Sequence, residues 1–164
     1  MTPFDIACVN PASIDLRLGT SYRRPDLVWS LHPGAWQMTM DPPTWAEEQH
    51  MSECGILLAP GEFILCCSLE TVKLPSDACG ILYSKSSTGR LGLEHMHAGY
   101  IDPGFHGQLT FEFHNVAPWP IKLAPGQRVM QMCVDQMTGS ALRDYSATGR
   151  YQNQVGATPA REAR

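Results

Sequence analysis

The chain has 164 residues, a formal net charge of −4, 43% hydrophobic residues and 17% charged residues, a composition typical of one globular domain. A negative net charge gives no broad positive field for binding the phosphates of a nucleic-acid polymer, and no stretch approaches the roughly 20 apolar residues of a membrane span. The first residues also lack the basic and apolar regions of a secretion signal. We therefore expect a cytoplasmic protein that binds neither nucleic-acid polymers nor membranes.

Short apolar runs are separated by fourteen glycines and thirteen prolines, and no run keeps helical periodicity over about twelve residues. This pattern predicts an all-β barrel or roll. In the first predicted strand Ile14, Leu16 and Leu18 alternate with polar residues, as in a strand with one buried face. The predicted strands, bounded mostly by Gly, Asn or Pro-Gly turns, are 13–18, 56–59, 63–71, 78–83, 108–115 and 128–135.

Two segments lack a clear period. Residues 21–53 are rich in Pro, Trp and Met and are predicted to form a long loop. From residue 139 to residue 164 most residues are small and polar, which predicts a tail that stays mobile until a ligand or a neighbouring subunit orders it. There is no internal repeat, and we predict a single domain over residues 1–164.

The cysteines and histidines do not indicate a metal site. Six cysteines show no CxxC spacing and are interpreted as free thiols of a reducing compartment. The H-x-E and P-C-x-x-C elements of the zinc deaminases are both missing. His95 and His97 stand at alternate positions without further ligands at convincing spacing, so no protein-bound zinc is predicted.

Two polar segments suggest ligand binding. The run 84–90, Ser-Lys-Ser-Ser-Thr-Gly-Arg, combines two cations with hydroxyls and a glycine after a predicted strand, which suits phosphate oxygens. A solvated turn is the alternative for this run. In 98–107, glycines and a proline force tight turns around Asp102, which either receives a sugar hydroxyl, orients a water or forms a local Asx-turn.

A third segment places one acid in mid-strand. Alternation over 108–114 puts Leu109, Phe111 and Phe113 on one face and Glu112 on the other, between two phenylalanines. Such a carboxylate is either used in general acid-base chemistry or lies on the wet face of an antiparallel sheet.

Taken together these segments resemble the dCTP deaminases of the dCTP deaminase and dUTPase superfamily. The similarity covers most of residues 10–161. The resemblance implies a distorted jelly-roll or β-barrel of the dUTPase-like type with short helical turns, in a homotrimer whose sites are shared between subunits. The matching segments are Asn10–Gly19, Ser86–Leu93, Ala98–Phe105, Thr110–Phe113, Pro120–Gly126 and Arg150–Gln154.

The resemblance also implies the reaction and the residues that perform it. A cytosine deoxynucleotide, with dCTP as the first candidate, is deaminated by water without zinc, and Mg²⁺ comes bound to the triphosphate. Glu112 matches the catalytic glutamate, supported by Ser86 and Arg90, and the tail 139–164 closes over the site. The residues that match substrate-binding positions are Lys85, Ser86, Ser87, Thr88, Gly89, Arg90, Asp102, Thr110, Phe111, Gln131, Tyr145, Arg150 and Gln154.

Other functions remain open at this point. One is a bifunctional dCTP deaminase and dUTP pyrophosphatase, or a dUTPase that yields dUMP, although ordinary dUTPases have no glutamate at the strand position of Glu112. Another is a non-catalytic nucleotide-binding module that acts through a protein partner. The segment 93–97 is one residue shorter than in the deaminases, which leaves dTTP inhibition and the choice among dCTP, dCMP and 5-substituted cytosines undecided.

Overall fold

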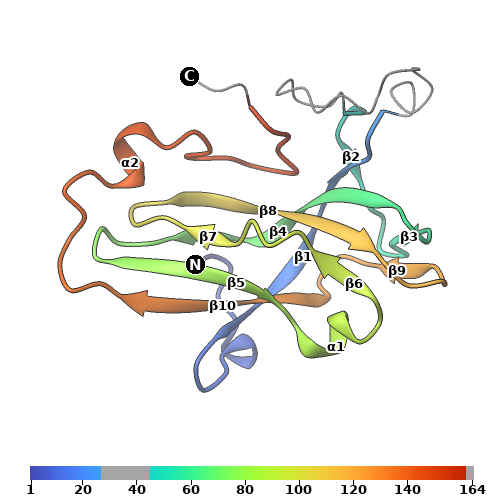
Figure 1. Cartoon of the computed structure of the whole chain (residues 1–164), viewed down its shortest axis with the longest axis horizontal. Helices are drawn as coiled ribbons and strands as arrows, with labels where there is room; N and C mark the ends of the chain where they lie inside the picture. Colours follow the sequence, from blue (N-terminus) through green and yellow to red (C-terminus); the bar gives the residue numbers. More distant parts are fainter. Residues whose placement is uncertain (27–44, 162–164) are drawn as a thin grey trace.

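The computed structural model describes residues 1–26 and 45–161. Strands dominate it, so the predicted all-β fold with short helical turns is confirmed (Figure 1). The helical turns are η1 (Ile6–Cys8), α1 (Ser86–Gly89) and α2 (Tyr145–Thr148). The strands are β1 (Ile14–Arg23), β2 (Gln49–His50), β3 (Ile56–Leu58), β4 (Phe63–Lys73), β5 (Ala78–Ser84), β6 (Leu93–His95), β7 (Tyr100–Ile101), β8 (His106–Asn115), β9 (Ile121–Leu123) and β10 (Arg128–Gln136).

All six predicted strands form, with boundaries that differ by one to two residues except at the end of β1, which continues to Arg23. The loop predicted over 21–53 is wrong at both ends, because residues 21–22 pair with Gln49 and His50 of β2. Both β2 residues are exposed, so no hydrophobic pattern marks this strand. Residues 27–44 of the predicted loop lie outside the described residues.

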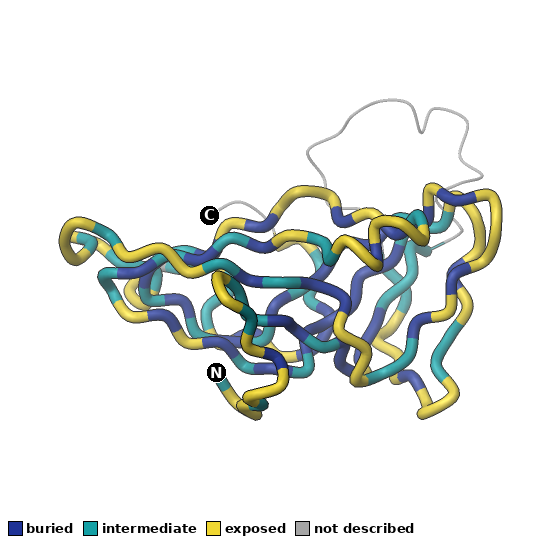
Figure 2. The backbone as a smooth tube through the Cα atoms, turned by 90° about the horizontal axis from the view of Figure 1, so that it is seen from below, coloured by how far each residue is buried: buried dark blue, intermediate teal, exposed yellow. Residues whose placement is uncertain are grey.

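One antiparallel sheet organises the molecule in the order β6-β8-β4-β1-β10-β5-β7, with β2 added to β1, and β3 pairs with β9 in a second small sheet. The pairing register shifts in β1 at Leu16/Arg17 and in β4 between Cys67 and Thr71. Such bulges bend strands and increase their twist, which lets the sheet curl. Figure 2 shows buried residues along the strands and exposed residues at the connections.

The hydrophobic core lies inside the curled sheet and fixes the face of each strand. In β8, Leu109, Phe111 and Phe113 are buried, and the residues between them are half-buried, as the alternation predicted. Leu16 of β1 and Met130 of β10 are fully buried against the same core. The core therefore holds β8 in the register that turns Glu112 away from the phenylalanines.

An ion pair between the half-buried Arg17 and the buried Glu70 joins β1 to the bulge of β4. The Arg17 Nε donates to Glu70 Oε1 at 2.7 Å, and the Arg17 backbone N–H donates to Glu70 Oε2 at 2.9 Å. The side-chain hydrogen bond to Glu70 raises the pKa of Arg17, so the guanidinium stays charged. At the bulge the Ser68 hydroxyl accepts the N–H of Leu109 at 2.8 Å, so this peptide group keeps a hydrogen bond where the backbone pairing is interrupted.

The tail crosses the sheet at β8 (Figure 1). The N–H of Gln108 donates to the Gln154 carbonyl at 3.0 Å, and the N–H of Asn153 donates to the His106 carbonyl at 2.7 Å. Further on, the N–H of Ala157 donates to the Ser21 hydroxyl at 2.8 Å. The tail is thus held mainly through peptide groups, and its mobility without a ligand stays a prediction. Among the described residues, no helix has the length and apolarity to cross a bilayer.

Candidate active site

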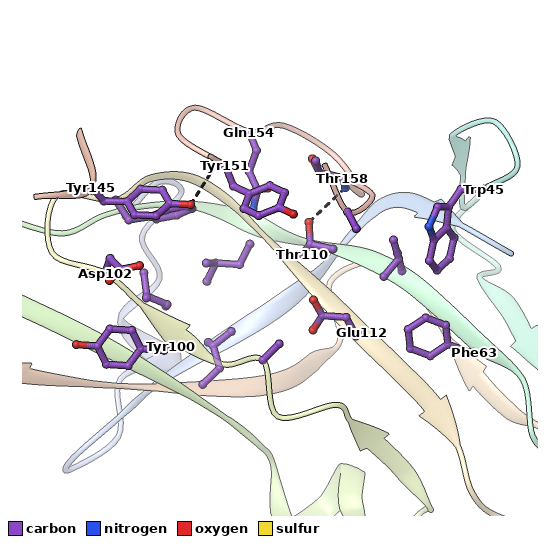
Figure 3. A pocket seen from close by; sticks show the side chains of 17 residues that line it. Trp45, Phe63, Tyr100, Asp102, Thr110, Glu112, Tyr145, Tyr151, Gln154 and Thr158 are labelled. Atoms are coloured by element: carbon purple, nitrogen blue, oxygen red, sulfur yellow. Dashed lines mark hydrogen bonds between the residues drawn. The ribbon is translucent and has the colours of Figure 1, made fainter. Parts of the chain in front are cut away.

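A cavity of about 470 Å³ lies between β8, the turn after β7 and the tail. This volume is in the range of small-molecule sites. Asp102 and Tyr145 stand at one end, Thr110 and Glu112 lie in the middle, and Trp45 and Phe63 close the other end (Figure 3). The wall is otherwise mainly apolar, with Leu65, Leu82, Ile101, Phe105 and Leu109 among the lining residues.

Glu112 projects from the middle of β8 into this cavity (Figure 3). Its side chain is 26% exposed, and its Oε2 lies 3.1 Å from Nε2 of His95, whose side chain is 3% exposed. The two atoms are not aligned for a hydrogen bond, and neither has another hydrogen-bond partner within residues 1–26 and 45–161. A carboxylate left without donors in a largely apolar cavity is poised to accept them from a ligand.

Asp102 is placed by the turn that follows β7. The N–H of Phe105 donates to the Asp102 carbonyl at 3.1 Å, and Gly104 adopts a φ of +81° that favours glycine. The Asp102 side chain is half-buried and lines the cavity. Beside it, Tyr100 lines the same wall, and a hydrogen bond with the Cys79 thiol is the main reason that its pKa is raised.

The tail supplies the roof of the cavity. The Tyr145 N–H donates to the Pro103 carbonyl at 2.8 Å, and its ring packs against Phe105 with centroids 5.8 Å apart. The Tyr145 hydroxyl accepts the N–H of Tyr151 at 3.0 Å. Thr110 accepts the N–H of Thr158 at 3.2 Å, so the tail bonds directly to the strand that carries Glu112 (Figure 3).

The predicted phosphate-binding run, residues 84–90, does not line this cavity. Its residues form α1 and its neighbours, and Ser86, Ser87 and Arg90 are exposed. Lys85 Nζ is 2.6 Å from Oδ2 of the buried Asp15, so this cation already has a carboxylate partner. Ser87 and Thr88 line a different, smaller hollow beside β9 and β10.

The predicted site residues therefore fall into two groups. One cavity brings together Asp102, Thr110, Glu112, Tyr145 and Gln154. Phe111 is fully buried in the core and does not line the cavity, although Thr110 and Glu112 on either side of it do. Outside the cavity lie Lys85, Ser86, Ser87, Thr88, Gly89, Arg90, Gln131 and Arg150.

Several lining residues were not predicted from the sequence. Tyr151, Trp45 and Phe63 line the cavity, and His95 touches Glu112, although the sequence analysis considered His95 only as a metal ligand and rejected that role. For His95 a signal was present, because Leu93 and His95 alternate with the exposed Glu94 in β6. Trp45 lies within the segment 21–53, which has no clear period, and nothing in the sequence directs it toward the cavity.

Comparison with known proteins assigns the family. A model of the dCTP deaminase-like family matches residues 1–137. The chain is 42% identical over 163 residues to a "dCTP deaminase, dUMP-forming" of Mycobacterium avium (strain 104), covering 97% of this chain and 85% of that protein. It is 40% identical over 175 residues to the protein of the same name from Parafrankia sp. (strain EAN1pec), covering 100% of this chain and 83% of that protein.

Solved structures agree on the fold. The 2'-deoxycytidine 5'-triphosphate deaminase from Agrobacterium tumefaciens superposes with a TM-score of 0.63 at 26% identity, over 81% of this chain and 42% of that chain. A mutant dUTPase from phage phi11 of S. aureus superposes with a TM-score of 0.54 over 87% of this chain and 88% of that chain, and at 15% identity it supports the fold alone. The chain belongs to the dCTP deaminase-like family, so both the resemblance and the enzyme class predicted from the sequence are confirmed.

Proposed function

We propose that this enzyme deaminates dCTP and then hydrolyses the resulting dUTP to dUMP and pyrophosphate. The observation that carries the proposal is the presence of Glu112 and Asp102 in one nucleotide-sized cavity. The full conversion is favoured over dUTP release because relatives at 40–42% identity, matched over nearly the whole chain, are named as dUMP-forming.

The first step requires proton transfer by a group beside the pyrimidine. Glu112 accepts a proton from water as the new oxygen bond to C4 forms, and passes it to N3. Glu112 then takes the proton of the C4 hydroxyl and gives it to the amine, and the C4–N4 bond breaks as ammonia leaves. Water thus supplies the carbonyl oxygen of uracil, and Glu112 ends the cycle in its starting state. The apolar walls of the cavity strengthen each electrostatic contact made there.

Asp102 is proposed to receive the 3'-hydroxyl of the deoxyribose, which fixes the base relative to Glu112. In the second step, water attacks the α-phosphorus of dUTP and pyrophosphate leaves. Mg²⁺ is expected to arrive bound to the triphosphate, where it neutralises phosphate charge. An ion that takes its ligands from phosphate oxygens needs no cluster of protein side chains. Within residues 1–26 and 45–161, no group of three or more His, Cys, Asp or Glu residues is arranged to hold a metal ion.

The triphosphate is proposed to contact a neighbouring subunit. Ser86 and Arg90, the predicted partners of Glu112, are exposed and lie outside the cavity of their own chain. A homotrimer in which the loop 85–90 of one subunit reaches the cavity of the next would complete each site. The tail residues Tyr145 and Gln154 would then close over the nucleotide.

Product analysis tests the proposed reaction. With dCTP and Mg²⁺, ammonia, pyrophosphate and dUMP should appear in equal amounts, and dUTP should yield pyrophosphate without ammonia. Ammonia with accumulating dUTP would mean a deaminase alone, and pyrophosphate from dUTP with no ammonia from dCTP would mean a dUTPase. Nucleotide binding without any product would indicate a non-catalytic module.

A complementation assay tests the shared site. Arg90→Ala and Glu112→Gln should each be inactive, and their co-expression in equal amounts should place an intact loop beside an intact Glu112 at one site of each mixed trimer, or about a quarter of all sites when subunits associate at random. Recovery of about that fraction of activity is expected, with light scattering giving the mass of a trimer. No recovery from mixed trimers would contradict a site assembled between subunits.

A further inference from the structure

His95 is buried directly behind the proposed catalytic carboxylate. It ends β6, where it pairs with Phe113 of β8. Its ring stands nearly perpendicular to Phe111 and Phe113, with centroids 6.4 and 6.2 Å apart. These ring contacts hold the imidazole in place and direct its Nε2 toward Glu112 Oε2, 3.1 Å away.

The backbone around His95 restrains the pair further. The N–H of Met96 donates to the Glu112 carbonyl at 3.1 Å, which ties the end of β6 to the residue that carries the carboxylate. The N–H of His97 donates to the His95 carbonyl at 2.8 Å, and His97 has a φ of +61°, so the chain turns sharply after His95.

The two facing atoms need a proton between them. Nε2 and Oε2 both carry lone pairs when unprotonated, both are buried, and neither has another hydrogen-bond partner in the described part of the chain. Two such lone pairs at 3.1 Å repel each other, whereas one shared proton makes a charge-assisted hydrogen bond after a small rotation of either side chain. The pair is therefore stable as a carboxylate facing an Nε2–H, or as a carboxylic acid facing a bare Nε2.

We propose that His95 is a positioning residue that acts through Glu112. It binds the buried Oε2 and leaves the other carboxylate oxygen as the one that exchanges protons with water, N3 and the departing amine. His95 itself neither gains nor loses a proton over the cycle. This inference rests on the proposed deamination and deepens it, because it assigns the geometry of the proton-transferring group to a second residue.

A comparison of two activities tests this role. His95→Phe keeps an aromatic ring between Phe111 and Phe113 but removes Nε2. The expected result is a fall of about 10- to 100-fold in kcat for ammonia release, the loss typical of one hydrogen bond to a charged group. The KM for dCTP, the melting temperature and pyrophosphate release from dUTP should stay close to wild type, because none of them depends on proton transfer by Glu112.

The controls separate positioning from packing. His95→Gln presents an amide nitrogen near the place of Nε2 and should recover part of kcat, whereas the shorter His95→Asn should not; this pair decides the question should His95→Phe fail to fold. His97→Asn, at the exposed neighbour, should behave as wild type because Asn tolerates the positive φ.

Unchanged ammonia release in His95→Phe, or equal rates in His95→Gln and His95→Asn, would overturn the inference. Equal losses of both activities together with a lower melting temperature would also overturn it, because they would indicate a packing role. Absence of ammonia release from the wild type would instead contradict the proposed function itself, so the two failures are distinguishable.

Discussion

Two carboxylates on neighbouring strands, Glu70 of β4 and Glu112 of β8, have opposite surroundings. Glu70 is 1% exposed, and its two oxygens accept hydrogen bonds from Arg17 at 2.7 and 2.9 Å. Glu112 faces a cavity, and its Oε2 has His95 at 3.1 Å without an aligned hydrogen bond. A carboxylate with a complete set of donors contributes to folding, whereas one with an incomplete set is available for a substrate.

The largest effect expected from this comparison is on catalysis at Glu112. Glu112→Gln should lower ammonia release by about 100- to 10,000-fold, because the amide does not shuttle protons. The melting temperature should stay the same or rise, since the replaced charge has few partners in the fold. Steady-state ammonia assays and thermal unfolding measure both quantities, with the exposed Glu94→Gln as the matched control. Near-normal turnover in Glu112→Gln would remove the basis of the proposed mechanism.

The next largest effect is on stability at Glu70. Glu70→Gln should reduce the free energy of unfolding by about 3 kcal/mol, because it leaves the Arg17 guanidinium without its buried counter-charge. Activity per folded molecule should remain near that of the wild type. Urea unfolding followed by assays on the folded fraction would measure both, again beside Glu94→Gln. If Glu70→Gln changed the free energy of unfolding as little as Glu94→Gln, the structural role given to Glu70 would be wrong.

The smallest effect concerns two buried thiols of β4, the strand that carries Glu70 and pairs with the strand of Glu112. Cys66 and Cys67 pair with Phe111 and Thr110 of β8, and burial raises the pKa of both thiols. The thiols of the unfolded chain ionise near a pKa of about 8.5, so the folded state holds more protons above that pH. The free energy of unfolding should therefore fall as the pH rises, and Cys66 should contribute roughly 1 kcal/mol to this fall at a pH of about 9.5.

Urea unfolding at neutral and at alkaline pH measures this slope. Cys66→Ala should be less stable at both pH values but should lose less stability between them, because one ionising group is gone. The exposed Cys54→Ala should keep the wild-type slope. Identical slopes in the wild type and Cys66→Ala would show that ionisation of Cys66 does not contribute.

The sequence was sufficient where local periodicity decides structure. Alternation over 108–114 predicted both the buried phenylalanines of β8 and the separate face of Glu112. It was not sufficient for β2, β6, β7 and β9, which have two or three residues each and are held by pairing with longer strands. Side-chain partners on different strands were also missed: Lys85 binds Asp15, and His95 of β6 reaches Glu112 of the neighbouring strand β8.

The structure of the tail could not be predicted from the sequence either. Its small polar residues gave no pattern, because Asn153, Gly156, Ala157 and Thr158 are held by their peptide N–H groups. Peptide groups are common to nearly every amino acid, so these four attachments do not depend on the side chains, although Gly156 keeps a φ of +74° that favours glycine. Exposed residues such as Val155, which is 81% exposed, can be replaced without loss of an attachment. Proline at any of the four donor positions would remove one.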